Sequence, residues 1–462
     1  VYKRQLFGGV VYWQFTPTVT AVSPDGGSTG IPASTALSIT FSREMQQDSV
    51  EGQLTIRPDT EGSIIWQEKT MSFIPDQPWQ NGQTIEVQLN RGARASGVLP
   101  LLTAKDYSWR FVIGDPRLVY LYPSVGPANI HLLDLNTGEI DQLTSYPGGI
   151  IDYSINRKGN IIYFSIKTGA AGSSIFRLDL QDQQGSDPVE ILSCPRATCR
   201  APVESPSGEY LAYERTASVG EDDPPYPQVW IQPLTSEDPS SSEQMSEYRA
   251  FKAGDSQNQT LQPHWSPAGL LTYYDTNQSA FVMLNLQEEQ ATLFPNQTGQ
   301  PGSWHPSGVS YVAAEIFFTE ISEAEETSSL DRIGSSHLIS FTLADQSSQD
   351  LTIVDNLEDT SPAYSPDGTR LAFARKYLNV ERWTPGRQMW LKSTTGSDEQ
   401  QLTNDPYYNH YEFTWSPTSD LIAYVRFNQT QLNEPPEIWI IDPATTLSTR
   451  QIEAGYAPQW IP

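Results

Sequence analysis

The residues of this chain that could carry chemistry are five histidines, two cysteines and an abundance of carboxylates. The histidines are His131, His264, His305, His337 and His410, and they are scattered along the sequence. There is no His-Glu-x-x-His, no Cys-x-x-Cys and no phosphate-cradling glycine loop with a lysine, and no nucleophile elbow leads into an α/β-hydrolase domain. Carboxylate pairs could serve glycoside hydrolysis, but a sequence does not show their separation in space. We therefore predict no catalytic residue, no cofactor and no metal site, and interpret the chain as a non-enzyme.

Cys194 and Cys199 are the two cysteines, and four residues separate them. We expect a disulfide that closes this short loop and that fits an oxidising exterior. Reduced thiols and half of a metal site are the alternatives. Zinc prefers four ligands and no second cysteine pair exists, so a metal site is disfavoured.

Other polar features permit binding or modification. Four Asn-Gln-Ser/Thr sequons, at Asn258, Asn277, Asn296 and Asn428, would permit glycosylation in a host that performs it, and chance is the alternative in a chain rich in Gln, Ser and Thr. The acidic stretches 221–223 and 320–326 are expected to be solvated loops. A divalent-cation site is the alternative reading of these stretches.

A repeated unit must position whatever function these residues have. Its clearest copy is Ala363-Tyr364-Ser365-Pro366-Asp367-Gly368, followed two residues later by the apolar triplet Leu371-Ala372-Phe373. Serine suits the first position of a type I turn, proline fixes φ at the second and glycine takes the last. A strand-only unit that recurs every 40 to 60 residues or so predicts one toroidal β architecture. Further copies, one of them degenerate, span residues 153–163, 203–213, 264–273, 303–313 and 414–424.

Aromatic residues recur just before these turns, and the tryptophans among them are Trp265, Trp304, Trp415 and Trp460. We expect them to pack between neighbouring sheets, because a large flat side chain buries much area there. A sugar-stacking platform is the alternative. His264 and His305 flank the same position, and we interpret them as packing residues rather than ligands.

The two ends of the repeat region complement each other. In each repeat, a strand with an aromatic residue precedes the turn, and a second, apolar strand follows it. Residues 117–120 match the second strand but have no aromatic strand before them, and residues 457–462 match the aromatic strand but have no second strand after them. We expect the last strand to complete the first sheet and close the ring without an open edge at the seam. Counting the units predicts seven blades within residues 115–462.

These motifs resemble the TolB-type, WD40-like β-propeller repeat, whose common form is Trp-Ser-Pro-Asp-Gly followed by Leu-Ala-Tyr or Ile-Ala-Phe. The resemblance covers about residues 117–462 and implies a propeller scaffold. A scaffold does not specify a function, so we expect function in loops, in the channel or in an added domain. Loops at 217–227 and 235–247 are candidate contact loops, and the alternative is that they are simply mobile.

Residues 16–114 carry short alternating strands between turns, which predict a β-sandwich. Phe41-Ser42-x-x-Met45, then Phe73-x-Pro75, then Gly92-Ala93 resemble the bacterial Ig-like domain of surface-layer proteins. This resemblance implies a spacer or adhesive module on the cell exterior. An additional β-cap on the propeller is the alternative. The expected fold is thus all-β, an Ig-like sandwich followed by a seven-bladed propeller closed by the C-terminal strand.

Residues 1–15 are read as an apolar remnant. Their apolar stretch, 6–15, is too short to span a bilayer, and we expect it to be the tail of a longer membrane anchor or signal. Residues 1–5 resemble a sequencing-adapter scar at the end of a truncated reading frame, and a cleaved mature chain is the alternative.

The charge of the chain limits its partners. Its net charge of −27 disfavours nucleic acid and repels an anionic membrane surface, so membrane contact is expected only through a missing N-terminal anchor. We predict a non-catalytic binding or scaffold protein at the bacterial cell surface, with a protein or glycan partner. The alternatives are a structural subunit of a surface array or filament, and a propeller-based enzyme that acts on glycans.

Overall fold

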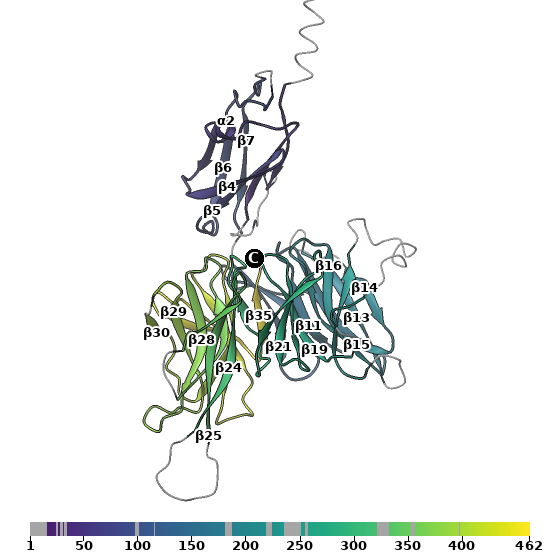
Figure 1. Ribbon diagram of the computed structural model, residues 1–462, viewed down its shortest axis with the longest axis vertical. Helices are drawn as coiled ribbons and strands as arrows, with labels where there is room; N and C mark the ends of the chain where they lie inside the picture. The colour runs from purple at the N-terminus through teal and green to yellow at the C-terminus, as the bar shows by residue number, and fades with distance from the viewer. Residues whose placement is uncertain are drawn as a thin grey trace, which may run out of the picture. The chain divides into compact units, whose positions relative to one another are not determined.

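The computed structural model describes residues 16–24, 26–27, 31, 35–97, 101–114, 116–180, 187–218, 224–234, 251–254, 257–320, 332–352, 356–396 and 398–462. Regular structure in these residues is almost entirely β-strand, as Figure 1 shows. The chain divides into two compact units between Pro116 and Arg117. None of the described helices is long and apolar enough to cross a membrane.

The N-terminal unit is a sandwich of two antiparallel sheets, ordered β1-β2-β5-β4 and β3-β6-β7. Strand β6 alternates exposed and buried residues without exception, because one face of each sheet meets the other sheet and one meets solvent. The elements are β1 (Val19–Ser23), β2 (Leu37–Phe41), α2 (Gln47–Glu51), β3 (Leu54–Arg57), β4 (Gly62–Gln67), β5 (Thr70–Pro75), β6 (Thr84–Leu89) and β7 (Tyr107–Val112).

The motif residues of this sandwich lie in its core. Phe41, Met45 and Phe73 are at most 5% exposed, and Ala93 is fully buried. Trp79 packs against Phe73 and Phe111, and its indole N–H donates to the carbonyl of Thr35 at 2.8 Å. Burial explains why aromatic and methionine side chains occupy these positions.

The second unit is a seven-bladed propeller of four-stranded antiparallel sheets. A single parallel bridge between Ser336 and Glu358 links the fifth and sixth blades. The first blade consists of β35 (Tyr456–Trp460), β8 (Arg117–Tyr122), β9 (Asn129–Asp134) and β10 (Ile140–Gln142), and the second of β11 (Ile150–Ile155), β12 (Ile161–Thr168), β13 (Gly172–Asp179) and β14 (Val189–Cys194). The third consists of β15 (Ala197–Glu204), β16 (Tyr210–Ala217), β17 (Gln228–Pro233) and β18 (Phe251–Lys252), the fourth of β19 (Thr260–Trp265), β20 (Leu271–Asp275), β21 (Ala280–Asn285) and β22 (Gln290–Pro295), and the fifth of β23 (Ser303–Trp304), β24 (Ser310–Glu320), β25 (Arg332–Thr342) and β26 (Ser347–Asp350). The sixth consists of β27 (Leu357–Tyr364), β28 (Arg370–Tyr377), β29 (Gln388–Ser393) and β30 (Glu399–Gln401), and the seventh of β31 (Tyr408–Trp415), β32 (Ile422–Asn428), β33 (Glu437–Ile441) and β34 (Ser448–Glu453).

The C-terminal strand closes the first blade. Strand β35 pairs antiparallel with β8, with Trp460 opposite Leu118 and Gln459 opposite Val119. Beyond the strand, the amide of Ile461 donates to the carbonyl of Arg117 at 3.0 Å. The predicted closure and the predicted number of blades are therefore confirmed.

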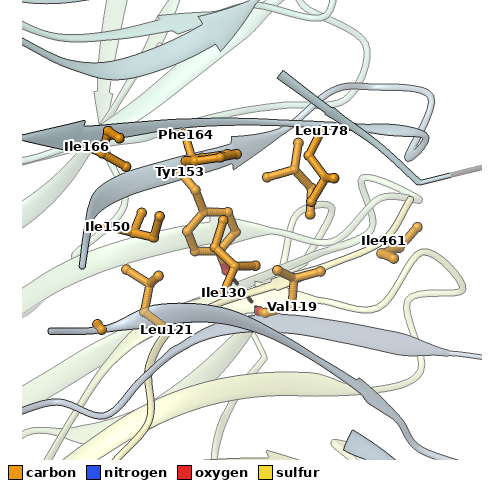
Figure 2. Packing of buried hydrophobic residues seen from close by; sticks show 11 residues of the cluster. Val119, Leu121, Ile130, Ile150, Tyr153, Phe164, Ile166, Leu178 and Ile461 are labelled. Carbon is orange, nitrogen blue, oxygen red and sulfur yellow. Dashed lines mark hydrogen bonds between the residues drawn. The ribbon is translucent and has the colours of Figure 1, made fainter. Parts of the chain in front are cut away.

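Each junction between neighbouring blades holds its own buried hydrophobic cluster, and together these clusters close the ring. Figure 2 shows the cluster between the first two blades, where Val119 and Ile130 face Tyr153 and Phe164. The hydroxyl of Tyr153 donates to the carbonyl of Val119 at 2.9 Å, which satisfies a buried polar group inside this apolar cluster.

The repeat tryptophans connect successive blades. The indole N–H groups of Trp265, Trp415 and Trp460 donate to main-chain carbonyls of the preceding blade at 3.0–3.1 Å. Trp304, in the same position, donates to the Thr272 hydroxyl at 3.1 Å. Trp304, Trp415 and Trp460 are at most 9% exposed. Their predicted role in packing between sheets is confirmed.

The predicted disulfide between Cys194 and Cys199 is present. It joins the end of β14 in the second blade to β15 in the third, and both cysteines belong to the buried cluster of that junction. The bridge thus spans the junction of two sheets that residues 195–196 already join along the chain.

We expect the paired substitution of Cys194→Ala and Cys199→Ala to lower the free energy of unfolding by about 2 kcal/mol, because a short closed loop restricts the unfolded chain. Urea unfolding followed by tryptophan fluorescence measures the change. Addition of a reductant should shift the midpoint of the wild-type protein and leave that of the variant in place. Equal midpoints for wild type and variant under oxidising conditions would contradict the expectation.

Candidate functional site

The longer described connections of the propeller gather at one end of its later blades. In an antiparallel four-stranded sheet, the connections after the first and third strands lie at one end, and those after the second and fourth lie at the other. The Ser-Pro turns lie at the first end. The second end carries residues 378–387, 402–407 and 429–436, and we call these three segments the loop face.

Large apolar side chains are exposed on the loop face. Val380 is 97% exposed, Leu432 75%, Tyr407 58% and Trp383 52%. A single exposed apolar residue is unremarkable, but several in the loops at one end of neighbouring blades make that end a candidate interaction surface.

A hollow of about 460 Å³ lies among the fifth, sixth and seventh blades at this end. Its walls come from the inner segments of three blades, residues 300–302, 360–362 and 409–413, together with Arg387 and Phe427. Prolines and phenylalanines supply apolar walls, and the polar groups come from Arg387, Asn409, His410, Tyr411 and Glu412. Such a mixture of apolar walls and a few polar groups is typical of ligand sites.

Arg387 and His410 form the polar wall of the hollow. The His410 Nδ1 atom lies 2.8 Å from the carbonyl of Arg387, so this nitrogen carries the hydrogen and Nε2 is left as an acceptor. Burial lowers the pKa of His410 to about 4, and its imidazole is neutral at neutral pH. The Arg387 guanidinium pairs with Glu358 at 2.5 Å. Within the described residues, Arg387 Nε and His410 Nε2 have no hydrogen-bond partner.

Glu412 belongs to a contact that recurs between blades. Its backbone has φ of +54°, and Ala201, Gln262, Ser361 and Ala457 adopt similar positive values at the equivalent bulge of their inner strands. The carboxylate of Glu412 accepts from the amide of Ala457 at 2.9 Å. Asp152 accepts from Ala201 and Glu214 from Gln262, both at 2.7 Å. These carboxylates each tie one blade to the bulge of the next.

Burial raises the pKa of Glu412, although the hydrogen bond from Ala457 opposes this shift. Glu412 as a whole residue is nonetheless exposed, so solvent screening limits this shift of its pKa. A carboxyl group whose pKa is raised by folding binds its proton more readily in the folded state, so its contribution to stability falls as pH rises through the folded pKa.

We therefore expect Glu412→Gln to match the wild type in melting temperature at acidic pH and to exceed it at neutral pH, since glutamine keeps an acceptor oxygen for Ala457 without the charge. Thermal unfolding across the acidic to neutral range measures this difference. An unchanged difference across that range, or a variant that is less stable at neutral pH, would show that the carboxylate charge is not disfavoured in the fold.

Cations and aromatic rings meet on the β28–β29 loop. The Lys376 ammonium lies 5.0 Å from the ring centre of Trp383, and the Arg382 guanidinium lies 3.5 Å from that of Tyr377. In the part of the chain that the structure describes, neither cation pairs with a carboxylate. Cation–π contacts hold these side chains in place while leaving their charges accessible to a partner.

A buried ionic group lies on β28, the strand that leads into the β28–β29 loop. Arg375 contacts Asp359 through Nε at 2.7 Å and also pairs with Glu399. Its guanidinium lies 4.9 Å from the Phe373 ring and 5.0 Å from the Trp390 ring. Burial acts to lower the pKa of Arg375, but hydrogen bonds and charge from Asp359 and Glu399 raise it overall. The Arg375 guanidinium therefore remains protonated.

The histidines divide into packing residues and one residue of the hollow. His264 is stacked on Tyr311 with ring centres 5.4 Å apart, and His305 contacts Ser307 and Gly368, as expected for packing between blades. His131 stacks on Tyr120, and His337 contacts Asp350. The structure brings only His410 into the hollow, and nothing in its sequence neighbourhood distinguishes it.

The sequons differ in access. Asn296 and Asn428 are 1% and 8% exposed, and the amide of Asn258 donates to Asp275 at 2.7 Å. Asn277 is exposed. In the folded protein, Asn277 is thus the sequon most open to modification.

Several predicted features fall outside the described residues. These are the acidic stretch 221–223, most of 320–326, the loop 235–247, part of 217–227 and the apolar remnant 1–15. Across the described ranges no group of three metal-ligating side chains occurs. The sequence also contains Gly26-Gly27-Ser28-Thr29-Gly30, which matches the Gly-x-Ser-x-Gly spacing. Ser28 is outside the described residues, and the first described helix after it, α2, begins only at Gln47, whereas a nucleophile elbow leads directly into a helix.

Comparison with protein families identifies the N-terminal unit. Residues 14–112 match the family model described as the bacterial Ig-like domain. The sandwich is a bacterial Ig-like domain. Its two sheets and buried Phe41, Met45 and Phe73 are consistent with that match. A comparison with curated protein sequences found no match.

The propeller is similar to several solved structures at low identity. Puromycin hydrolase, as an S511A variant complexed with PGG, is 10% identical with a TM-score of 0.52, and the match covers 74% of this chain and 54% of that chain. TolB from Acinetobacter baumannii is 12% identical with a TM-score of 0.42, over 89% and 83% of the chains. A prolyl endopeptidase is 14% identical with a TM-score of 0.49, over 73% and 49%. The likeness to puromycin hydrolase shows a shared fold and no more.

Proposed function

We propose that this chain is a non-catalytic binding protein outside the bacterial cytoplasm, with the propeller as docking scaffold for a protein partner and the Ig-like domain as spacer. The loop face carries the proposal. It presents Val380, Trp383, Tyr407 and Leu432 to solvent beside the cations Lys376 and Arg382. Aromatic and arginine side chains are the residues that dominate binding energy at protein interfaces.

The disulfide and the Ig-like domain support the proposed location. A Cys194–Cys199 bridge forms and persists in oxidising compartments. Bacterial Ig-like domains suit an envelope or exterior position, and the acidic net charge of −27 suits solubility there.

An enzymatic role has less support. Puromycin hydrolase and the prolyl endopeptidase are enzymes, but the match covers about half of each of those chains. Glycoside hydrolysis requires two carboxyl groups across the scissile bond. Among the residues that line the hollow, Glu412 is the carboxylate, and it accepts a hydrogen bond from Ala457.

A matched pair of leucines on the seventh blade tests the proposal. Leu432 on the loop face is 75% exposed, and Leu447 in the turn at the opposite end is 73% exposed. We expect immobilised protein to capture a partner from envelope extract. The double variant Trp383→Ala with Leu432→Ala should weaken that capture by about tenfold or more, because tryptophan truncation at an interface centre commonly costs over 1.4 kcal/mol.

Leu447→Ala should bind as the wild type does. Capture that is equal for all three proteins would place the partner elsewhere, and absence of any captured partner would count against a binding role. Ordered lattices or fibres in negative-stain images of the purified protein would instead favour a structural subunit of a surface array.

A further inference from the structure

The hairpin of β24 and β25 is longer than its blade needs. Each strand has 11 residues, and the two pair from Ser310 opposite Thr342 to Glu320 opposite Arg332. The inner strand β23 pairs only with Tyr311 and Val312 of β24. Figure 1 shows the hairpin in green on the side of the propeller formed by the later blades. The second half of β24 is therefore paired on one edge and unpaired on the other.

The direction of the main-chain groups identifies the unpaired edge. In a strand, the N–H and C=O of one residue point to the same side, and the side alternates along the chain. Val312 pairs toward β23, and the carbonyl of Ala314 accepts from the side chains of Asn296 and Thr298 at 2.8 and 2.7 Å on that side. The groups of Ile316 and Phe318 therefore point to the same free edge.

Those groups are open to a partner strand. The amide of Ile316 donates to its neighbour's side chain, Glu315 Oε1, at 2.7 Å. Within the described residues, the carbonyl of Ile316 and both main-chain groups of Phe318 have no partner strand. Unpaired groups on a regular strand form a template for one more strand.

The side chains of this edge are apolar and exposed. Ile316 is 38% and Phe318 is 58% exposed, and they share one face of the hairpin because they are two residues apart. Folded proteins usually protect such edges with lysine, proline or a bulge. Residues 313–319 contain no lysine and no proline, and the pairing of β24 with β25 shows no bulge.

The charge of the sequence that leads into and through β24 indicates the kind of strand that can be added. Residues 253–331 contain no lysine or arginine. Their ten acidic residues are Asp255, Asp275, Glu288, Glu289, Glu315, Glu320, Glu323, Glu325, Glu326 and Asp331. A second copy of this chain, with net charge −27, would bring the same acidic sequence to the edge. Repulsion disfavours that pairing, whereas a cationic segment is attracted.

We propose that the free edge of β24 at Ile316 and Phe318 binds an extended, apolar segment flanked by lysine or arginine in the partner protein, by strand addition. The inference rests on the proposed function, because it takes the partner to be a protein. Main-chain hydrogen bonds to Ile316 and Phe318 supply the affinity, and alternate side chains of the segment cover these two residues. The flanking cations supply selectivity by attraction to Glu315, which lies at this edge, and to the acidic net charge of the chain.

A synthetic peptide tests the edge with the whole chain. The probe is a fluorescein-labelled, end-capped peptide with the sequence Lys-Val-Thr-Val-Lys-Val-Thr-Val-Lys, and binding is followed by fluorescence anisotropy. An analogue with glutamate in place of each lysine tests charge. Two analogues N-methylated on alternate residues, one on odd and one on even positions, test the main-chain hydrogen bonds. We expect the basic peptide to bind at least about tenfold more tightly than the acidic one, and one methylated analogue to lose about tenfold in affinity.

Variants of Phe318 locate the binding site. Phe318→Pro removes an amide that the β25 ladder does not use, so we expect the fold to persist and peptide affinity to fall by about tenfold or more. Phe318→Thr keeps the amide and the strand propensity, and should stay within about threefold of the wild type. Melting temperatures of both variants check the fold, and the methylated peptides test the same contact on unaltered protein.

The proposal would be overturned if the wild type did not bind the basic peptide, or if it bound the basic and acidic peptides with equal affinity. It would also be overturned if both methylated analogues bound as tightly as the parent peptide, or if Phe318→Pro bound the peptide as tightly as the wild type does. None of these results touches the envelope-capture test. A partner that is captured by the wild type and equally by Phe318→Pro would leave the binding function standing and remove the edge from it.

Discussion

Replacement of Trp460 by alanine is expected to lower the free energy of unfolding by about 3–5 kcal/mol, which is the range for deletion of a buried aromatic side chain. Trp460 is 5% exposed and packs at the seam against Val425, Ile438 and Ile440 of the seventh blade. Its indole N–H donates to the carbonyl of Thr414 at 3.0 Å. The substitution thus removes packing and a hydrogen bond at the place where the ring closes, because β35 joins β8 of the first blade by strand pairing rather than by a short connection along the chain.

Urea unfolding followed by circular dichroism measures this change. Trp460→Phe keeps most of the packing and loses the donor, so it should cost about 1–3 kcal/mol. Trp383→Ala, at an exposed position on the loop face, serves as the control and should change stability by less than about 0.5 kcal/mol. A similar unfolding midpoint for Trp460→Ala and Trp383→Ala would show that the seam does not limit the stability of the propeller.

The second large effect is expected from Arg375→Ala, which should also cost about 3–5 kcal/mol because it leaves a buried carboxylate without its counter-ion. Asp359 is 1% exposed, and its carboxylate contacts Arg375 through both oxygens at 2.7 and 2.8 Å. The Thr352 hydroxyl donates to the same carboxylate at 2.8 Å. This hydrogen bond remains in the variant, but it does not compensate for the lost positive charge of Arg375.

The pH dependence gives the loss a distinctive signature. Burial raises the pKa of Asp359 even though Arg375 and Thr352 oppose the shift, and removal of Arg375 raises it further. A carboxyl group with a raised folded pKa costs stability once pH exceeds that pKa, so the deficit of Arg375→Ala should shrink as the solution is acidified. The double variant Arg375→Ala with Asp359→Asn should recover part of the loss at neutral pH.

Arg450→Ala is the matched control, since the Arg450 side chain is 49% exposed and pairs with Glu437 at 3.0 Å on the surface. It should cost far less than Arg375→Ala, because an exposed ion pair contributes little to stability. If Arg375→Ala were no more damaging than Arg450→Ala, or if its deficit were the same in acid, the buried pair would not stabilise the sixth blade.

Features that depend on neighbours in sequence were predictable. The Ser-Pro turns, the apolar triplets and the spacing of Phe41, Met45 and Phe73 each follow from local turn chemistry and from the period of burial along a strand. Repetition of one unit made the number of blades countable. The disulfide was predictable because Cys194 and Cys199 have no other cysteine to pair with.

Closure of the ring, in which Trp460 lies opposite Leu118, was also predictable, because each end of the repeat region lacks what the other supplies. This inference needed no knowledge of distances, since a four-stranded sheet that is missing its inner strand presents an unpaired edge and the last strand has no other sheet to join.

The candidate site was not predictable in the same way. The hollow combines Arg387, His410 and residues 300–302 and 360–362, which lie on three blades, and no motif connects them. The bulges with positive φ at Gln262 and Glu412 were equally hidden, because neither residue is a glycine that would signal the left-handed region.

The free edge at Phe318 was hidden for a related reason. Nothing in the sequence of residues 313–319 indicates that β23 is too short to pair with them. The sequence by itself determined the repeated strands, their turns, the sandwich, the closing strand and the disulfide, because these follow from short-range geometry and from pairing rules. Only the tertiary structure decided which charges are buried, which residues from different blades share a hollow and which strand edge stays open, because these depend on packing between segments tens of residues apart.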